Sequence, residues 1–373
     1  MATPQTPSIS IGPGSTIAIT GVNGYIGSSI ATTFIKAGYH VKGSVRDASR
    51  CVWLREYFTK LLVSSDDASD SKSSHHPPRG TFTLVEIPDL ADIDAYVPLL
   101  TGAASLILTT TTASFTVTDP AALIPMTEAQ ILAGLEAASR NPVVQSVVLT
   151  GSAWATHTPE PDVPKQLSTT SWNEDVMRAA YDEDWASKGN AADEEARAAR
   201  TMAVFMASKV VQERAAWDWV RRMRPRFRFN VVLASTVFGR VSEPASQGQP
   251  STAGFLAMVV NGSVEEVAKM VRPQWFVDVE DVAVLHLAAA VRADVDAERI
   301  FAFSEPYTWN AVLEVLRKAY PEKKFVDDLE GLGRCLVEVP NEKGEQLLRE
   351  FGREGWTGLE ESVKRTVESL KLI

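Results

Sequence analysis

One predicted helix carries a lysine on the same face as apolar residues, where a charged side chain is unexpected. In AVFMASKVVQERAAWDW (203–219), the 3.6-residue helical period places Phe205, Lys209, Gln212 and Ala216 on the same side. Such a lysine either extends along its alkyl stem to the surface or points its ammonium into a pocket that uses the charge. The helix alone favours the surface, because most helical lysines do no chemistry.

A glycine-rich turn predicts a nucleotide site. TGVNGYIG (20–27) follows the β-branched run STIAIT and leads into a helical pattern. Glycines at such a turn let the backbone approach a pyrophosphate, and the helix N-terminus offers N–H donors and the positive end of its dipole. After the first strand of a strand–helix–strand unit, the motif indicates dinucleotide binding rather than a purely structural turn. The residues expected at the cofactor are Gly21, Gly24, Tyr25, Ile26 and Gly27.

The end of the second strand favours NADP over NAD. An acid that binds the ribose of NAD is expected about 20 residues after the glycines. Here the strand ends in GSVRDASR, which places Arg46 first and Arg50 nearby. Guanidinium groups bind a 2′-phosphate through charge-assisted hydrogen bonds, so both are assigned to NADP. The adjacent Asp47 keeps NAD as the alternative, since it could accept from the 2′-hydroxyl.

Two residues after the third predicted strand are expected near the adenine ring. Asp89 and Leu90 follow TFTLVEI (81–87), where folds of this kind pass the base. A helix cap is an equally good interpretation of Asp89.

The order of apolar patterns supplies a scaffold for these residues. Strand-like runs alternate with helical ones, and the strand cores are apolar throughout, which is typical of a parallel sheet covered on both faces. We therefore expect an α/β, Rossmann-type doubly wound fold. Strands are expected at 15–20, 39–45, 81–87, 105–110, 143–152 and 229–235. Helices are expected from the glycine turn through 37, after residue 52, around 92–100, over 120–140 and over the lysine-bearing segment.

Beyond residue 240 the order becomes irregular, and we expect a smaller substrate-binding lobe there. Helices are expected at 252–261, 281–292, 308–319 and 358–371, with a strand at 299–304. In the helix near 281, Asp281 is the expected cap and His286 is expected to pack inside. The predicted division is a flexible N-terminus (1–14), a Rossmann domain (15–240) with a polar insert (64–80), and the lobe (241–373).

Composition excludes several classes of protein. The 373 residues carry a net charge of −10 with a pI of about 5.2, which argues against a nucleic-acid or anionic-membrane surface. Cys51 and Cys335 match no metal or disulfide spacing, and the adjacent His75 and His76 lie in the polar insert, so no metal site is expected. Neither a secretory signal nor a membrane-length apolar run is present, so we expect a cytoplasmic protein.

Taken together, the motifs resemble those of the extended short-chain dehydrogenase/reductases. They are most similar to the branch of dihydroflavonol reductases and fungal aldehyde reductases and ketoreductases. The resemblance spans about residues 15–290. It rests on TGVNGYIG, VRDASR, IPDL, VVLTGSAWA, FMASKVVQERAAWDW, VVLASTVFG and WFVDVEDVAVLH, which occur in the family's order.

The family's chemistry uses a serine, a tyrosine and a lysine. The resemblance assigns Ser152 to the substrate carbonyl and Lys209 to the nicotinamide ribose, where the lysine also lowers the pKa of the tyrosine. Four residues before the lysine, where the tyrosine should stand, this chain has Phe205, which is still expected to lie at the cofactor. A phenylalanine fills nearly the same volume but has no proton to donate, and loss of a positioned general acid lowers rates by typically ~10²–10⁴-fold.

Other groups could replace the missing phenol. Tyr181 and His157 lie between Ser152 and Lys209, and each has a plain alternative as a surface tyrosine or a solvated histidine. Two further departures concern the cofactor face. TTTT (109–112), which includes the expected cofactor residue Thr110, replaces an Ala-Ser-Pro-like turn, and Ala234 replaces a proline.

Three functions follow from this pattern. The first is an NADP-dependent reductase of a ketone or aldehyde in secondary metabolism, with a small apolar or polyketide-like substrate covered by STAGFLAMVVNG (251–262). The second is a non-redox dehydratase, isomerase or cyclase on the same scaffold, and the third is a nucleotide-binding protein without catalysis. Relatives often pair through helices, and the helix of Lys209 is long enough for this, so a homodimer stands as an alternative to a monomer.

Overall fold

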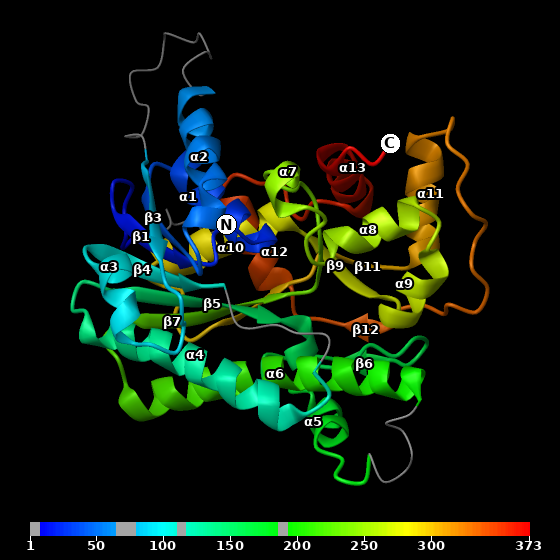
Figure 1. Cartoon of the computed structure of the whole chain (residues 1–373), viewed down its shortest axis with the longest axis horizontal. Coiled ribbons are helices and arrows are strands. Elements are labelled where there is room, and N and C mark those ends of the chain that lie inside the picture. Colours follow the sequence, from blue (N-terminus) through cyan, green and yellow to red (C-terminus); the bar gives the residue numbers. More distant parts are fainter. Residues whose placement is uncertain (1–7, 65–79, 110–116, 186–192) are drawn as a thin grey trace, which may run out of the picture.

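A parallel sheet of seven strands forms the centre of the molecule, in the order β10-β7-β5-β4-β1-β2-β3 (Figure 1). The structure, a computed structural model, describes residues 8–64, 80–109, 117–185 and 193–373. The strands are β1 (Thr16–Thr20), β2 (His40–Val45), β3 (Phe82–Glu86), β4 (Ala103–Leu108), β5 (Ser146–Ser152), β7 (Arg228–Ala234) and β10 (Arg299–Ala302). The predicted fold class is confirmed, and no helix in the described part of the chain could cross a membrane.

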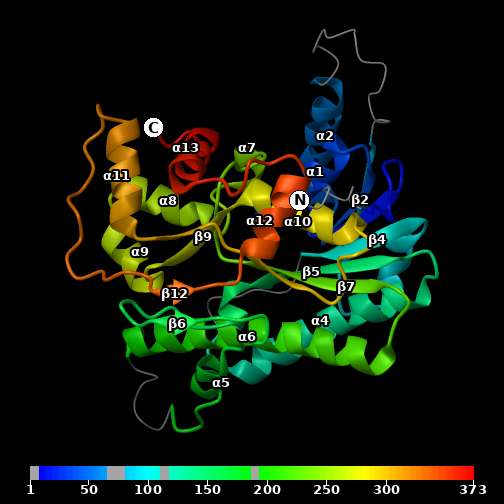
Figure 2. The same ribbon diagram turned by 180° about the vertical axis from the view of Figure 1, so that it is seen from behind.

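Helices cover both faces of this sheet, as the apolar strands require. All six residues of β4 are buried. One face carries α1 (Tyr25–Lys36), α2 (Trp53–Ser64), α10 (Val279–Val291) and α12 (Glu342–Glu350), and the other carries α4 (Pro120–Arg140) and α6 (Glu194–Met223) (Figures 1 and 2). The strand order reverses between β1 and β4, which places a ligand crevice at their carboxyl ends.

Local signals explain the helix boundaries that the sequence predicted well. The helix α4 begins where Asp119 accepts a hydrogen bond from the backbone N of Ala121, with Pro120 in the first helical position. The helix expected near 92–100 is instead a 3₁₀ turn (Asp94–Tyr96) followed by α3 (Val97–Leu100), a single turn. Pro98 in that turn has no backbone N–H to donate.

The N-terminus requires a correction. We expected residues 1–14 to be flexible, but residues 8–14 lie within the described chain and pack against it. The backbone N of Ser10 donates to the carbonyl of Val291, and the hydroxyl of Tyr39 donates to the carbonyl of Ile11 at 2.9 Å. Ile11 is 1% exposed. Burial of this apolar side chain and the backbone bonds to the end of α10 hold the segment in place.

The predicted boundary at residue 240 does not divide the structure into a sheet domain and a separate lobe. Both α10 and β10 come from the predicted lobe but complete the large sheet, because β10 pairs with β7 and α10 packs on α1. The rest of the lobe is a three-stranded sheet of β8 (Thr236–Phe238), β9 (Gln274–Asp278) and β11 (Glu305–Tyr307), with α8 (Ala253–Val260), α9 (Val264–Met270), α11 (Trp309–Ala319) and α13 (Leu359–Leu370). Figures 1 and 2 place this lobe beyond the carboxyl ends of the large sheet.

Candidate active site

The glycine-rich turn has the geometry that a pyrophosphate needs. Gly21 has a φ of +65°, which favours glycine, and a Cβ on Gly27 would lie 2.2 Å from the carbonyl oxygen of Gly21. Gly24 precedes α1 in an extended conformation with no side-chain cap. The first N–H groups of α1 are therefore offered to a ligand rather than to a capping side chain, and the residues fit a dinucleotide.

A segment far along the chain closes one side of this turn. The side-chain Nε2 of Gln247, at the end of α7 (Pro244–Gln247), donates to the carbonyls of Asn23 at 3.1 Å and Gly24 at 3.2 Å. The hydroxyl of Tyr25 donates to the carbonyl of Gly239 at 2.8 Å, so this predicted cofactor residue joins α1 to the segment after β8. The sequence offered no signal for Gln247. Ile26 is half-buried beside Tyr25.

The end of β2 presents two arginines and a carboxylate that is already engaged. Arg46 and Arg50 are exposed. The Oδ1 of Asp47 accepts from the N of Ser49 at 2.9 Å and from its hydroxyl at 2.5 Å, and the hydroxyl holds the pKa of Asp47 below its ordinary value. Because Asp47 stabilises its own turn, it is a poor partner for a ribose hydroxyl, and the arrangement fits a 2′-phosphate better.

The two residues expected near adenine follow β3. The Oδ1 of Asp89 accepts a hydrogen bond from the backbone N of Ala91 at 2.9 Å. Asp89 therefore stabilises a local turn, a role close to the helix cap considered as the alternative. Asp89 is exposed, and Leu90 is half-buried with its carbonyl accepting from the hydroxyl of Tyr96. Thr110 lies outside the described residues, as do His75 and His76.

The predicted catalytic residues gather at the carboxyl end of β5. Ser152 ends that strand and pairs in register with Ala234 of β7. Its Oγ accepts from the backbone N of Trp154 at 3.2 Å, and this acceptor role leaves the hydroxyl proton for a substrate. The ring of Trp154 meets the ring of Phe205 edge-on, with 5.6 Å between centres. Trp154 therefore links the serine to the buried face of α6.

Lys209 lies one turn after Phe205 on α6. Its Nζ is 5.3 Å from the centre of the Phe205 ring, and its side chain is only partly accessible. Burial lowers the pKa of Lys209 to about 8. Phe205 is 6% exposed. The lysine is not fully exposed, and its ammonium lies over the ring of Phe205, the position at which the resemblance expects the catalytic tyrosine.

A buried ion pair anchors the next turn of α6. The Nε of Arg299 lies 2.7 Å from the Oε1 of Glu213, and both side chains are nearly inaccessible. Arg299 also donates to the carbonyls of Thr169 and Ser171 and lies over the ring of Trp172. This network fixes the helix that presents Lys209.

His157 is buried, and its hydrogen bonds define its tautomer. The hydroxyl of Thr156 donates its single proton to the carbonyl of Ala153 at 2.7 Å, so it must accept from the Nδ1–H of His157 at 3.0 Å. The Nε2 is then an acceptor, buried without a hydrogen-bond partner among the described residues. Burial and the charge of Lys165 lower the pKa of His157 to about 4. A neutral imidazole in this form accepts at Nε2, which disfavours the predicted role of His157 as proton donor.

Tyr181, the other predicted substitute donor, lies at the surface. It follows α5 (Glu174–Ala180) and is 48% exposed. Figures 1 and 2 show α5 on the side of α6 away from the sheet. The structure therefore does not bring Tyr181 together with Ser152.

The start of α10 corrects one prediction and confirms another. Asp278, not Asp281, caps the helix by accepting from the N of Glu280 at 2.8 Å, whereas Asp281 accepts from the N and hydroxyl of Thr357. His286 packs inside the helix as predicted, with its Nδ1 donating to the carbonyl of Val282.

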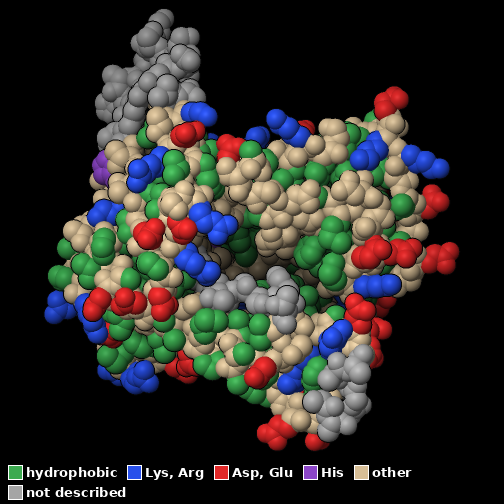
Figure 3. All heavy atoms as spheres, in the orientation of Figure 1, with side chains coloured by type: hydrophobic (Ala, Val, Ile, Leu, Met, Phe, Trp, Pro, Cys, Tyr) green, Lys and Arg blue, Asp and Glu red, His purple; other side chains and the backbone are tan. Residues whose placement is uncertain are grey.

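The space-filling view shows a hollow near the middle of one face, with hydrophobic side chains deep inside and Lys or Arg side chains on one rim (Figure 3). It lies between the lobe and the layer of α4 and α6, where the strands end. Within the described residues no group of three or more His, Cys, Asp or Glu could hold a metal ion.

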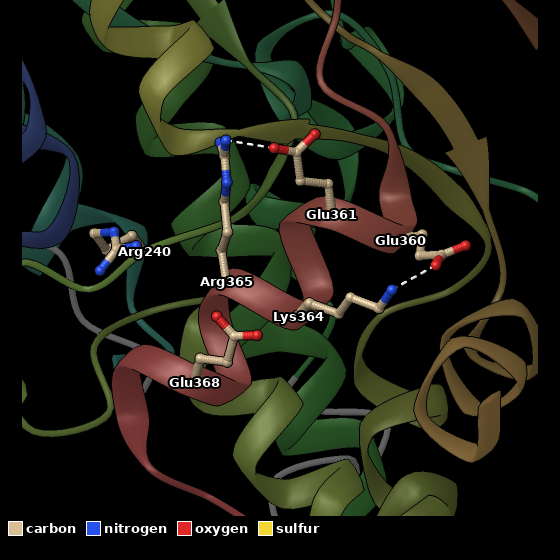
Figure 4. Close-up of a pocket in the computed structure, with 6 residues that line it drawn as sticks. All are labelled: Arg240, Glu360, Glu361, Lys364, Arg365 and Glu368. Atoms are coloured by element: carbon tan, nitrogen blue, oxygen red, sulfur yellow. Dashed lines mark hydrogen bonds and ion pairs between the residues drawn. The ribbon is translucent and has the colours of Figure 1, made fainter. Parts of the chain in front are cut away.

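A separate pocket on α13 belongs to the outer surface of the lobe. It has a volume of about 430 Å³ and is lined by Arg240, Glu360, Glu361, Lys364, Arg365 and Glu368 (Figure 4). Lys364 pairs with Glu360, and Arg365 pairs with Glu361. These charges are largely neutralised by one another, so the pocket offers little to a charged ligand.

The chain is similar along nearly its whole length to known reductases, although no family model matches it. It is 32% identical to ketoreductase adrE of Penicillium rubens, over 94% of this chain and 95% of that one. Aldehyde reductase 2 of Sporidiobolus salmonicolor is 29% identical over 95% of this chain and 96% of its own length. NAD-dependent epimerase/dehydratase terH of Aspergillus terreus is 28% identical over 96% and 97%.

Among solved structures, yeast methylglyoxal/isovaleraldehyde reductase Gre2, complexed with NADPH, has the same fold. The TM-score is 0.73 at 20% identity, over 95% of this chain and 98% of that one.

Proposed function

Because the chain belongs to the extended short-chain dehydrogenase/reductase family, we propose that it is an NADP-dependent reductase of a ketone or aldehyde. One observation carries the proposal. The edge-on contact of the Trp154 and Phe205 rings connects Ser152, whose Oγ accepts from the backbone N of Trp154, to Lys209, whose Nζ lies over the Phe205 ring. This constellation stands at the carboxyl edge of the sheet, on the same edge as the glycine-rich turn.

Each part of the site has a role in this reaction. The first N–H groups of α1 hold the pyrophosphate, and Arg46 and Arg50 hold the 2′-phosphate. When bound, the reduced nicotinamide supplies a hydride. Lys209 binds the adjacent ribose hydroxyls, and Ser152 donates a hydrogen bond to the carbonyl oxygen of the substrate, which stabilises the charge that develops there.

The substrate we propose is small and apolar or polyketide-like, a carbonyl compound of secondary metabolism. Its support is the aromatic pair of Trp154 and Phe205, in which Trp154 follows the serine closely in the chain. The relative adrE is named a ketoreductase, which supports a carbonyl substrate. Two further expectations, a cytoplasmic protein and a homodimer, stay predictions.

A non-redox reaction is the second candidate, and Phe205 favours it. A dehydratase, isomerase or cyclase would need the shaped pocket and Ser152 but not a phenolic proton donor. One relative is named an NAD-dependent epimerase/dehydratase, a name that includes this class of reaction. A nucleotide-binding protein without catalysis is the third candidate.

A paired comparison of wild type and Phe205→Tyr tests the proposal. Both proteins are incubated with NADPH and a panel of aromatic and polyketide-like ketones and aldehydes, and cofactor oxidation is followed. Consumption of NADPH by wild type supports the reductase. No consumption by wild type, with clear consumption by the variant, would overturn it in favour of the second candidate. Tight NADPH binding without turnover in either protein would favour the third.

A further inference from the structure

We propose that Lys209 itself donates the proton to the carbonyl oxygen in this protein, in the place of the phenol that Phe205 lacks. The inference rests on the proposed reductase function and adds a role to the ribose binding that the resemblance assigns to this lysine. Its basis is the geometry of one turn of α6.

The ammonium of Lys209 lies over the ring that stands in place of the family's phenol. Its Nζ is 5.3 Å from the centre of the Phe205 ring, four residues earlier on the same helix face. The Phe205 ring is 6% exposed and is held edge-on by Trp154, so it forms a fixed apolar wall. A lysine has a flexible four-carbon stem and three N–H donors, which lets Nζ reach an oxygen over that wall while still donating to a ribose hydroxyl.

Four of the described tyrosines and His157 are poorly placed to donate the proton. The hydroxyls of Tyr25, Tyr39 and Tyr96 donate to backbone carbonyls in the core, of Gly239, Ile11 and Leu90 respectively. Tyr181 is half exposed beyond α6. His157 carries its proton on Nδ1 and bonds it to Thr156. Lys209 is the acidic group on the helix face that the Trp154–Phe205 contact connects to Ser152.

The proton balance of the step is simple. As the carbonyl carbon accepts the hydride, the carbonyl π pair moves to oxygen and forms the O–H bond with a proton from Nζ. The Nζ–H bond breaks, and its electron pair stays on nitrogen as a neutral amine. Solvent then returns the proton to Nζ.

The electrostatic surroundings suit this cycle. Burial alone lowers the pKa of Lys209 to about 8, and no charged side chain of the described parts of α4, α5 or β5 contributes to that shift. At pH 7 the ammonium is the main form, yet it releases a proton far more readily than an exposed lysine. An acid whose pKa lies near the working pH is the most effective general acid.

The test begins with a readout that needs neither cofactor nor substrate. Protein labelled with ¹³C at lysine Cε is titrated by NMR, and the Lys209 signal is identified by its absence in Lys209→Arg. We expect a midpoint near 8, with the wild-type kcat falling as the pH rises through the same value. A midpoint near the ordinary value of about 10.4 would overturn the proposal.

Kinetics in two backgrounds separates proton donation from ribose binding. A guanidinium keeps the charge and the N–H donors but does not release a proton. We expect Lys209→Arg to lower kcat by ~10²–10⁴-fold, and to lower it much less when Phe205→Tyr supplies a phenol. Equal losses in both backgrounds would show that Lys209 only binds the ribose. Lys318→Arg, at an exposed ion pair on α11, is the matched control for the exchange itself.

Failure of the proposed function has a different signature. Wild type would then oxidise no NADPH with any carbonyl of the panel, whatever the NMR midpoint. A normal midpoint in an active enzyme would instead refute only the role of Lys209.

Discussion

The glycine-rich turn and the buried face of α6 are the two halves of the proposed site, but they depend on different parts of the chain. At the turn, the proposed binding is by the backbone, and glycine is required at position 27 because a Cβ there would meet the carbonyl of Gly21. On α6, the chemistry depends on individual side chains, Phe205 and Lys209. A single substitution can therefore change the reaction on α6 while the nucleotide half stays intact. This is why nucleotide binding and turnover have to be measured separately in this protein.

The largest effect is expected on the α6 side, where one ion pair anchors the helix. Glu213→Ala leaves the buried guanidinium of Arg299 without its carboxylate, and breaking such a pair costs about 3–5 kcal/mol. We expect the free energy of unfolding in urea to fall by that amount. Asp218→Ala, which breaks the exposed pair with Arg221 on the same helix, is the control and should change it by about 0–1 kcal/mol. Similar losses in both variants would mean that the buried pair does not anchor α6.

In the nucleotide half, the largest effect is expected from a substitution at Gly27. In Gly27→Ala the new Cβ would lie 2.2 Å from a backbone oxygen, which cannot move without displacing the turn. Overpacking of this kind destabilises by typically ~1–3 kcal/mol, and we expect the upper end. NADPH affinity, measured by calorimetry, should fall together with stability. Gly12→Ala, where nothing lies within 4 Å of the added Cβ, should leave both unchanged. Normal NADPH affinity in Gly27→Ala would contradict the assigned role of the turn.

The sequence predicted the two halves unequally, for physical reasons. The glycine turn and α4 carry local signals, a required backbone conformation at Gly21 and a capped start at Asp119, so both were predicted well. Gln247 contacts the glycine-rich turn although more than 200 residues separate them in the sequence. No local sequence pattern indicates such a contact. Likewise the tautomer of His157 depends on a folded network with Thr156. Contacts that the topology creates had to come from the structure.

Asp278, which caps α10 and accepts from the hydroxyl of Ser362, should make stability depend on pH. Burial, with the neighbouring charge of Asp281, raises the pKa of Asp278 to about 6. The folded state therefore binds a proton that the unfolded state releases near pH 4. The resulting stabilisation is complete below about pH 4 and is lost as the pH rises through about 6.

Asp278→Asn isolates this contribution. The amide can still cap α10 and has no proton to lose, so wild type should lose stability relative to the variant between pH 4.5 and 7.5. The expected difference is on the order of 2 kcal/mol. Urea unfolding of both proteins at the two pH values measures this difference in stability. The contributions from titration of His157 and His286 cancel, because both proteins contain these residues. Parallel pH profiles would show that Asp278 has an ordinary pKa.

The smallest expected effect, in the nucleotide half, is on the choice between NADPH and NADH rather than on cofactor binding as a whole. Arg46 and Arg50 are exposed, while Asp47 is held by Ser49. Removing one guanidinium from a 2′-phosphate costs about 1.5 kcal/mol, so Arg46→Ala should lower NADPH affinity by about tenfold and leave NADH affinity nearly unchanged. Arg55→Ala, on the following helix, is the matched control. If Asp47 bound the ribose instead, Asp47→Ala would weaken NADH binding more than Arg46→Ala weakens NADPH binding. The opposite order is expected here, since the Asp47 carboxylate already accepts two hydrogen bonds within its own turn.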